Sequence, residues 1–200
     1  MNWLKIYLPT YLLCYFAIAF ILPTWRAYRQ TGIWPVTFGR SASAHDYLSR
    51  LMKWLVSGLF LSTTFYALGD PVYRWLVPVT YLQIKALHIT GLVLIHLSLA
   101  WIFIAQLQMG NSWRIGIDAD HPTTLVTLGL FSISRNPVFL GMIVTAWGLF
   151  AILPNALSFF TALGSYWIIQ VQIRLEEAFL QQQLGAIYRQ YQKKTKRLLL

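Results

Sequence analysis

The stretch that decides the fold is Ser134-Arg135-Asn136-Pro137-Val138-Phe139-Leu140-Gly141. This short polar box stands directly before an apolar segment, residues 138–153, and Pro154-Asn155 separates that segment from a second one, residues 156–171. A joint of two residues predicts an antiparallel helical hairpin. An acidic pair, Glu176-Glu177, follows the hairpin. Because ionisable groups are costly in lipid, a polar box and an acid pair at the edge of apolar helices indicate a functional site.

Three more apolar segments lie upstream, at residues 3–25, 51–68 and 83–109. They are close to the roughly 20 residues that a membrane crossing needs, whereas the two segments of the hairpin are shorter. The chain of 200 residues is 57% hydrophobic and 11% charged, against about 25% charged in ordinary soluble domains. The sequence therefore predicts an all-α, polytopic membrane helical bundle with about five transmembrane helices.

The tail after the hairpin carries apolar residues at helical spacing, which predicts a C-terminal amphipathic helix; they are Leu180, Leu184, Ile187, Tyr188 and Tyr191. We expect one membrane domain, residues 1–200, with three N-terminal spans in 3–109 and a distinct region in 110–197. This length leaves no room for a separate soluble enzyme domain.

The basic residues lie mostly on one side of the expected topology. Of the 16 Lys and Arg, only Lys5, Arg74 and Lys85 fall on the side of the N-terminus. The positive-inside rule predicts a cytoplasmic C-terminus, in a bacterial inner membrane or the endoplasmic reticulum. The net charge of +10 predicts contact with anionic membrane lipids and no nucleic-acid partner, because no soluble basic domain carries such a site.

The side chains that can carry chemistry gather on the predicted cytoplasmic side, in the loop 110–136 and at the start of the tail. Four scattered histidines and one cysteine do not have metal-ligand spacing, so we expect no metal. Arg114, Arg135, the two acids and many aromatic residues remain, and they suit a zwitterionic or sulfonium ligand. On spacing alone, an interfacial salt-bridge network is the simpler interpretation.

Three motifs favour a ligand-binding site over a salt-bridge network. Residues 125–141 resemble the signature L-V-x-x-G-x-Y-x-x-x-R-H-P-x-Y-x-G of the isoprenylcysteine carboxyl methyltransferase family, with Phe131 and Phe139 in place of Tyr and Asn136 in place of His. Residues 176–191 are similar to the family's E-E-x-x-L tail, and residues 110–116 are similar to a G-x-x-W-R-x-G box. The resemblance covers residues 110–197, and the first three spans match only in being apolar.

The resemblance implies an S-adenosylmethionine (SAM) site at the cytoplasmic end of these helices. It implies that Arg135 and Asn136 act at the catalytic centre and that Arg174, offset by two from the family's usual position, contacts the substrate. The implied cofactor-binding residues are Thr124, Leu125, Val126, Phe131, Asn136, Pro137, Phe139, Glu176 and Glu177. Glu176 would bind the methionyl ammonium group, and Glu177 would matter less, as a supporting or lipid-facing residue.

The expected activity is methylation of a carboxylate on a lipophilic small molecule or prenylated substrate such as an isoprenylcysteine. A carboxylate is already ionised at pH 7 and needs no general base. The alternative enzyme is a phospholipid N-methyltransferase, which would need a base such as Glu177 or Asp120. A non-catalytic membrane lipid-binding protein and a sterol reductase with a nicotinamide cofactor are the remaining alternatives.

Overall fold

The computed structural model describes residues 2–36, 44–114 and 124–199, and these residues form helices and no strand. The elements that form the bundle are α1 (Trp3–Phe16), η1 (Ala17–Ile21) and α2 (Leu22–Thr31), which follow one another directly, and α3 (Ala44–Leu68), α5 (Lys85–Met109), α6 (Pro137–Ile152) and α7 (Ala156–Leu184). The short elements are α4 (Asp70–Tyr73), η2 (Arg74–Leu76), η3 (Thr80–Leu82), η4 (Gly110–Ser112), η5 (Gly129–Ser132) and α8 (Ala186–Lys194).

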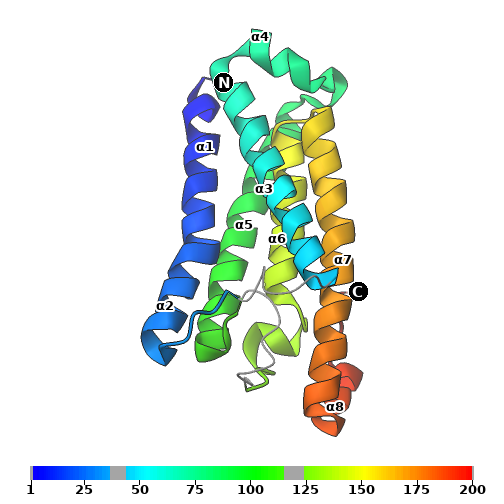
Figure 1. The fold of residues 1–200 in the computed structure, drawn as a ribbon. Coiled ribbons are helices and arrows are strands. Elements are labelled where there is room, and N and C mark those ends of the chain that lie inside the picture. Colours follow the sequence, from blue (N-terminus) through cyan, green and yellow to red (C-terminus); the bar gives the residue numbers. More distant parts are fainter. Residues whose placement is uncertain (1, 37–43, 115–123, 200) are drawn as a thin grey trace.

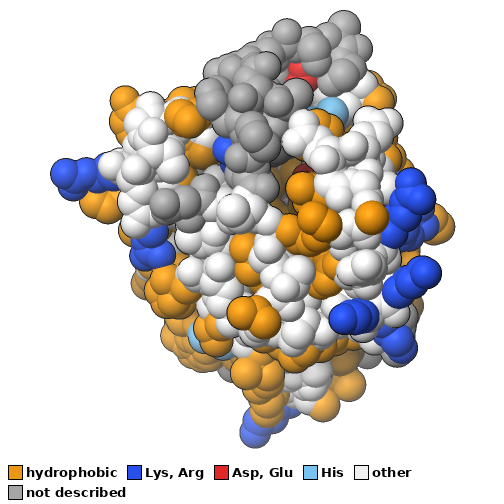
Figure 2. Space-filling view, turned by 90° about the horizontal axis from the view of Figure 1, so that it is seen from below, with side chains coloured by type: hydrophobic (Ala, Val, Ile, Leu, Met, Phe, Trp, Pro, Cys, Tyr) orange, Lys and Arg blue, Asp and Glu red, His pale blue; other side chains and the backbone are white. Residues whose placement is uncertain are grey.

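The long helices stand side by side in one bundle, as Figure 1 shows. The N-terminus and α4 lie at one end of the bundle, and α2, the end of α5 and α8 lie at the other (Figure 1). We call the second end the basic end, because Lys and Arg side chains gather along one edge of its surface (Figure 2). The predicted all-α bundle is confirmed.

Helices α5 and α6 approach each other closely at glycines. A Cβ atom on Gly91 would lie 2.6 Å from the carbonyl oxygen of Gly148 and 2.6 Å from Cγ1 of Ile152. Small residues at such a crossing let two backbones touch, which is how helices associate where lipid removes the hydrophobic driving force. Ser98 and Thr145 add a buried hydrogen bond of 2.7 Å between the hydroxyls of the same two helices. This pair is the rigid centre against which α1 packs its buried leucines.

The joint between α6 and α7 is held by Asn155, which is fully buried. Its side-chain oxygen accepts a hydrogen bond from the Ser158 backbone N–H at 2.9 Å, and the Ser158 hydroxyl is 3.2 Å from the Asn155 backbone N–H, forming a capping box. Its amide nitrogen donates to Ser62 at 3.0 Å and to Tyr73 at 3.3 Å. The predicted antiparallel hairpin is therefore confirmed, and α3 and α4 are tied to its turn.

Among the described residues, four helical stretches are long and apolar enough to cross a membrane: residues 3–31, 44–68, 85–109 and 156–184. The predicted fourth span, residues 138–153, forms a shorter helix, α6, of 16 residues. The predicted fifth span, residues 156–171, is the first part of a longer helix, α7, which continues to Leu184 and carries the acid pair in its second half. The amphipathic helix of the tail begins inside α7, and Gly185, whose φ is +53°, breaks it before α8.

Candidate functional site

The polar box lies where α6 begins. Pro137 occupies the first helical turn, where its missing N–H costs no hydrogen bond. Asn136 is the N-cap residue, yet its side chain makes no cap hydrogen bond. Its Nδ2 instead donates to the Arg197 carbonyl at 3.0 Å and to Glu177 Oε1 at 3.4 Å. Asn136 therefore connects the start of α6 to α7 and to the end of the tail.

Glu177 is the centre of a buried ion-pair network. Arg135 Nε and Nη2 lie 2.9 Å and 2.8 Å from its Oε1, and Arg197 Nε and Nη2 lie 3.0 Å and 2.7 Å from its Oε2. The Glu177 side chain is 5% exposed and that of Arg135 is 9% exposed. The hydrogen bonds that Arg197 donates to Glu177 raise the pKa of Arg197 above its usual value. Both carboxylate oxygens are occupied by arginine side chains, and the buried side chain does not face lipid. The predicted supporting role of Glu177 stays a prediction.

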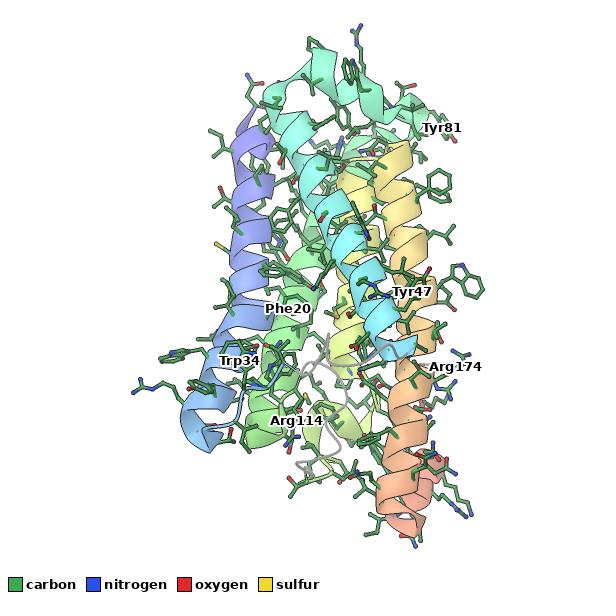
Figure 3. The ribbon with its side chains drawn as sticks, viewed as in Figure 1. Phe20, Trp34, Tyr47, Tyr81, Arg114 and Arg174 are labelled. Carbon is green, nitrogen blue, oxygen red and sulfur yellow. The ribbon has the colours of Figure 1, made fainter. Side chains whose placement is uncertain are left out.

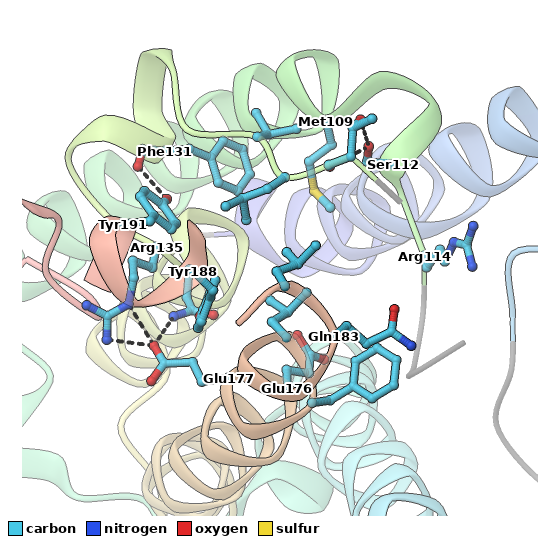
Figure 4. A pocket seen from close by; sticks show the side chains of 17 residues that line it. Met109, Ser112, Arg114, Phe131, Arg135, Glu176, Glu177, Gln183, Tyr188 and Tyr191 are labelled. Carbon is cyan, nitrogen blue, oxygen red and sulfur yellow. Dashed lines mark hydrogen bonds and ion pairs between the residues drawn. The ribbon is translucent and has the colours of Figure 1, made fainter. Parts of the chain in front are cut away.

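Glu176 faces a different direction from its neighbour. Successive residues of an α-helix are turned by about 100°, since a turn takes about 3.6 residues. Glu176 Oε1 accepts a hydrogen bond from Gln172 Nε2 at 2.8 Å, and it makes no ion pair within the part of the chain that the structure describes. Arg135 and Arg197 pair with Glu177 and not with Glu176, so the predicted contact of Glu176 with a methionyl ammonium group stays a prediction. Figure 4 shows the two acids on different sides of α7.

A polar pocket of about 180 Å³ opens beside these residues. Eight of the predicted site residues line it: Thr124, Leu125, Val126, Phe131, Arg135, Asn136, Glu176 and Glu177. Segments far apart in the sequence therefore meet here, as the resemblance implied. Tyr191 closes one side, and its hydroxyl donates to the Phe131 carbonyl at 2.6 Å (Figure 4). Burial raises the pKa of Tyr191 to about 12, so this hydroxyl stays a donor at neutral pH.

An apolar cavity of about 550 Å³ adjoins the polar pocket. Its walls come from α1 and η1, one face of α3, the start of α6, and α7. The residues that line both spaces are Met109, Arg114, Phe131, Arg135, Asn136 and Glu176. Pro137 and Phe139, predicted to bind the cofactor, line this cavity and not the polar pocket.

Arg174 is the predicted site residue that the structure places apart from the others. It lines neither the polar pocket nor the apolar cavity, and its Nη1 donates to the Gln170 carbonyl at 2.7 Å and to Gln170 Oε1 at 3.0 Å. Figure 3 shows it pointing outward from α7. Its predicted contact with a substrate therefore stays a prediction.

The sequence did not reveal the residues that the first three spans contribute. Phe16 and Phe20 line the apolar cavity, and Phe20 lies on the inner side of the first helix (Figure 3). Phe20 lies in η1, a π-helix, which is a form frequent at functional sites. The buried Gln106 amide donates to the Ala19 carbonyl of η1 at 2.6 Å. On α3, the sequence feature that could have indicated a site residue was Lys53, a charged residue inside an apolar helix. In the polar pocket, Ser112, Gln183 and Tyr188 were also missed as site residues.

Metal ligation has no support in the described ranges: no group of three or more His, Cys, Asp and Glu residues could hold an ion there. Asp120, one of the candidate bases, lies outside the described residues.

His96 makes hydrogen bonds to other residues of the bundle. Its Nδ1 lies 2.6 Å from the Leu92 carbonyl, and its other ring nitrogen bonds the Tyr7 hydroxyl.

The long apolar helices, together with a polar site at one end of the bundle, define an integral membrane protein. Residues 84–187 match the model of the family described as phospholipid methyltransferase, so the chain belongs to that family. This is a family of membrane methyltransferases that includes the isoprenylcysteine carboxyl methyltransferases. No curated protein matches the chain.

Proposed function

We propose that this protein is a SAM-dependent methyltransferase that methylates a lipophilic substrate at the junction of the polar pocket and the apolar cavity. The observation that carries the proposal is the shared wall. Glu176, Arg135 and Asn136 line both spaces. A water-soluble cofactor in one space and a lipid in the other would meet at these side chains.

The residues of the polar pocket fit SAM. Glu176 offers a carboxylate whose described partner is a neutral amide, and a carboxylate there suits the ammonium group of the methionyl part. The rings of Phe131, Tyr188 and Tyr191 line the pocket, and aromatic faces attract a sulfonium cation. When bound, SAM supplies the activated methyl group; the side chains hold it in line with the acceptor, which is a positioning effect.

The apolar cavity fits an acceptor that enters from the bilayer. Phe16, Phe20, Val56, Phe139 and Met142 form much of its wall. Long apolar chains would be solvated there as they are in lipid. The cavity therefore supports a lipophilic acceptor.

We infer that the reacting group is more readily a carboxylate than an amine. One buried donor without a hydrogen-bond partner in the described part of the chain lines this cavity, Trp113 Nε1. Lys53, which is exposed, adds a positive charge to the cavity wall. A methyl acceptor with a negative charge would accept a hydrogen bond from the indole, which is otherwise costly to bury. A carboxylate needs no base, and a prenylated cysteine is one such substrate.

A phospholipid amine is the second candidate, and two observations favour it. The family model that matches is described as phospholipid methyltransferase. In addition, Glu176 lines both spaces, so it could take a proton from an ammonium group before methyl transfer.

We also propose that the basic end faces the cytoplasm, following the positive-inside rule. The polar pocket lies at that end, and the cytoplasm would then supply SAM.

Calorimetry with SAM on the purified protein tests the proposal. Binding would exclude the scaffold and the nicotinamide-dependent reductase alternatives, and absence of binding would overturn the proposed function. Incubation with labelled SAM and a prenylcysteine analogue or phosphatidylethanolamine vesicles then separates the acceptors. An ester releases its label as methanol in base, whereas a methylated amine keeps it.

A further inference from the structure

We propose that residues 192–197 form a clasp that fixes Arg135 and Asn136 in the wall of the polar pocket, with Arg197 as the positioning residue that closes it. The inference rests on the proposed function, because it assigns the clasp a role in SAM binding. It concerns a segment that reaches the site from outside the region matched by the family model, residues 84–187.

The clasp holds the polar box through backbone carbonyl groups. The Arg135 backbone N–H donates to the Lys196 carbonyl at 2.9 Å, in a bridge that pairs Ser134 with Lys196. Arg135 Nη1 donates to the carbonyls of Gln192, at 3.3 Å, and Thr195. The acceptors therefore fix both the main chain and the guanidinium group of Arg135.

Asn136 is held in the same way. Its Nδ2 donates to the Arg197 carbonyl at 3.0 Å, which is shorter than its 3.4 Å contact to Glu177. Without the clasp, this amide would keep only the longer contact among its described side-chain hydrogen bonds. Asn136 lines both the polar pocket and the apolar cavity, so its orientation affects both spaces.

The Arg197 side chain closes the clasp onto α7. It supplies both described partners of Glu177 Oε2, while Arg135 and Asn136 bond Oε1. The Arg197 side chain is 38% exposed, whereas the Glu177 side chain is 5% exposed. Arg197 therefore lies at the outer edge of a buried network and acts on Arg135 and Asn136 through Glu177.

Anchors on both sides keep the clasp in place. Before it, Tyr191 is buried and bonds the Phe131 carbonyl. After it, Leu198 packs against the buried cluster of Ile143, Ile169 and Ile173. The basic residues 193–197 could also be interpreted as contacts to anionic lipid headgroups, and this fits the exposed Lys193, Lys194 and Lys196. It does not fit Arg197, which turns inward.

The test compares Arg197→Gln with Arg189→Gln, a matched change at an exposed arginine of α8. We expect Arg197→Gln to raise the calorimetric Kd for SAM about tenfold and Arg189→Gln to leave it within twofold. Arg197→Lys keeps the charge with a single donor group, so its Kd should lie between those of the wild type and Arg197→Gln. An unchanged Kd in Arg197→Gln would overturn the proposal.

A double-mutant comparison tests whether Arg197 acts through Glu177. In a Glu177→Gln background, Arg197→Gln should add less than a twofold change, because the two residues share one interaction. A full tenfold effect in that background would show that Arg197 acts by another route and would overturn the clasp.

Amide hydrogen exchange, measured without SAM, separates the clasp from the proposed function. The Arg135 amide should exchange at least tenfold faster in Arg197→Gln than in the wild type and in Arg189→Gln. If the wild type fails to bind SAM, the proposed function fails while this readout still decides whether the clasp exists. Equal exchange rates in all three proteins would overturn the clasp.

Discussion

The two ends of the α6–α7 hairpin are both polar, but their polar residues differ in what they face. At the turn, the described side-chain hydrogen bonds of Asn155 all go to other residues of the hairpin, α3 or α4: Ser62, Tyr73, Leu153 and Ser158. At the basic end, Glu177 is equally saturated, but its neighbour Glu176 faces a pocket and a cavity. Polar residues at the turn therefore stabilise the hairpin, and those at the basic end also create a place where a ligand can bind.

The largest expected effect concerns the side of the membrane on which each end lies. With Cys14 replaced by Ala, we expect Tyr81→Cys and Lys194→Cys to react with a membrane-impermeant maleimide from opposite sides of sealed vesicles. Tyr81 is 78% exposed, and Lys194 is exposed on α8 at the basic end. Lys194→Cys should react only from the cytoplasmic side. Labelling of both sites from one side would contradict the topology.

The two acids should differ strongly in their effect on stability. Glu177→Ala leaves Arg135, which is 9% exposed, without its carboxylate, and breaking a buried ion pair on one side costs about 3–5 kcal/mol. Glu176→Ala removes only a hydrogen bond with Gln172, for which we expect about 1 kcal/mol. Unfolding by SDS from detergent micelles measures both. Equal losses would contradict the assignment of Glu177 as the structural acid.

At the other end of the hairpin, Asn155→Ala should lower the free energy of unfolding by about 2–4 kcal/mol. The loss combines about 1 kcal/mol for the helix cap with about 1–3 kcal/mol for partners left unsatisfied in the buried turn. Asn155→Ser keeps a cap oxygen but loses the donors to Ser62 and Tyr73, so its loss should be intermediate. SAM affinity should not change in either variant, since the turn lies at the end opposite the pocket.

The sequence predicted the hairpin because its signals are local: Pro137 opens one helix, and Pro154-Asn155 leaves room for nothing but a turn. The gathering of residues 124–136 and 176–191 followed from the resemblance. Neither the local sequence signals nor the family resemblance could predict that Arg135 and Arg197 form ion pairs with Glu177 instead of Glu176. Adjacent residues on a helix face different directions, and only the path of residues 192–197 decides which acid Arg197 reaches.

The contribution of the first three spans escaped prediction for a related reason. Phe16, Phe20 and Lys53 become site residues through the packing of α1 and α3 against the hairpin. Apolar periodicity does not distinguish a residue that faces lipid from one that faces a cavity. The sequence predicted helices on both sides of the acid pair, but not that the last span and the start of the tail form one continuous helix, α7.

The variant Glu176→Gln tests whether the acid that faces the polar pocket binds SAM. We expect it to weaken SAM binding at least about tenfold, or roughly 1.4 kcal/mol, because the amide cannot pair with an ammonium group. Stability should be nearly unchanged, since Gln172 can still donate to the new side-chain oxygen. Calorimetry beside SDS unfolding separates the two quantities. Unchanged SAM affinity in the folded variant would return Glu176 to a structural role.

The smallest effect is expected at Arg174, two residues before the acid pair. Its described partners are both on Gln170, and it points away from the bundle. Exposed contacts of this kind contribute about 0–1 kcal/mol, so Arg174→Gln should change the SAM Kd and the acceptor KM by less than about twofold. The sequence resemblance predicts instead that the acceptor KM rises while SAM binding stays constant. A selective rise of fivefold or more would therefore mean that the acceptor reaches past the cavity to the outer face of α7.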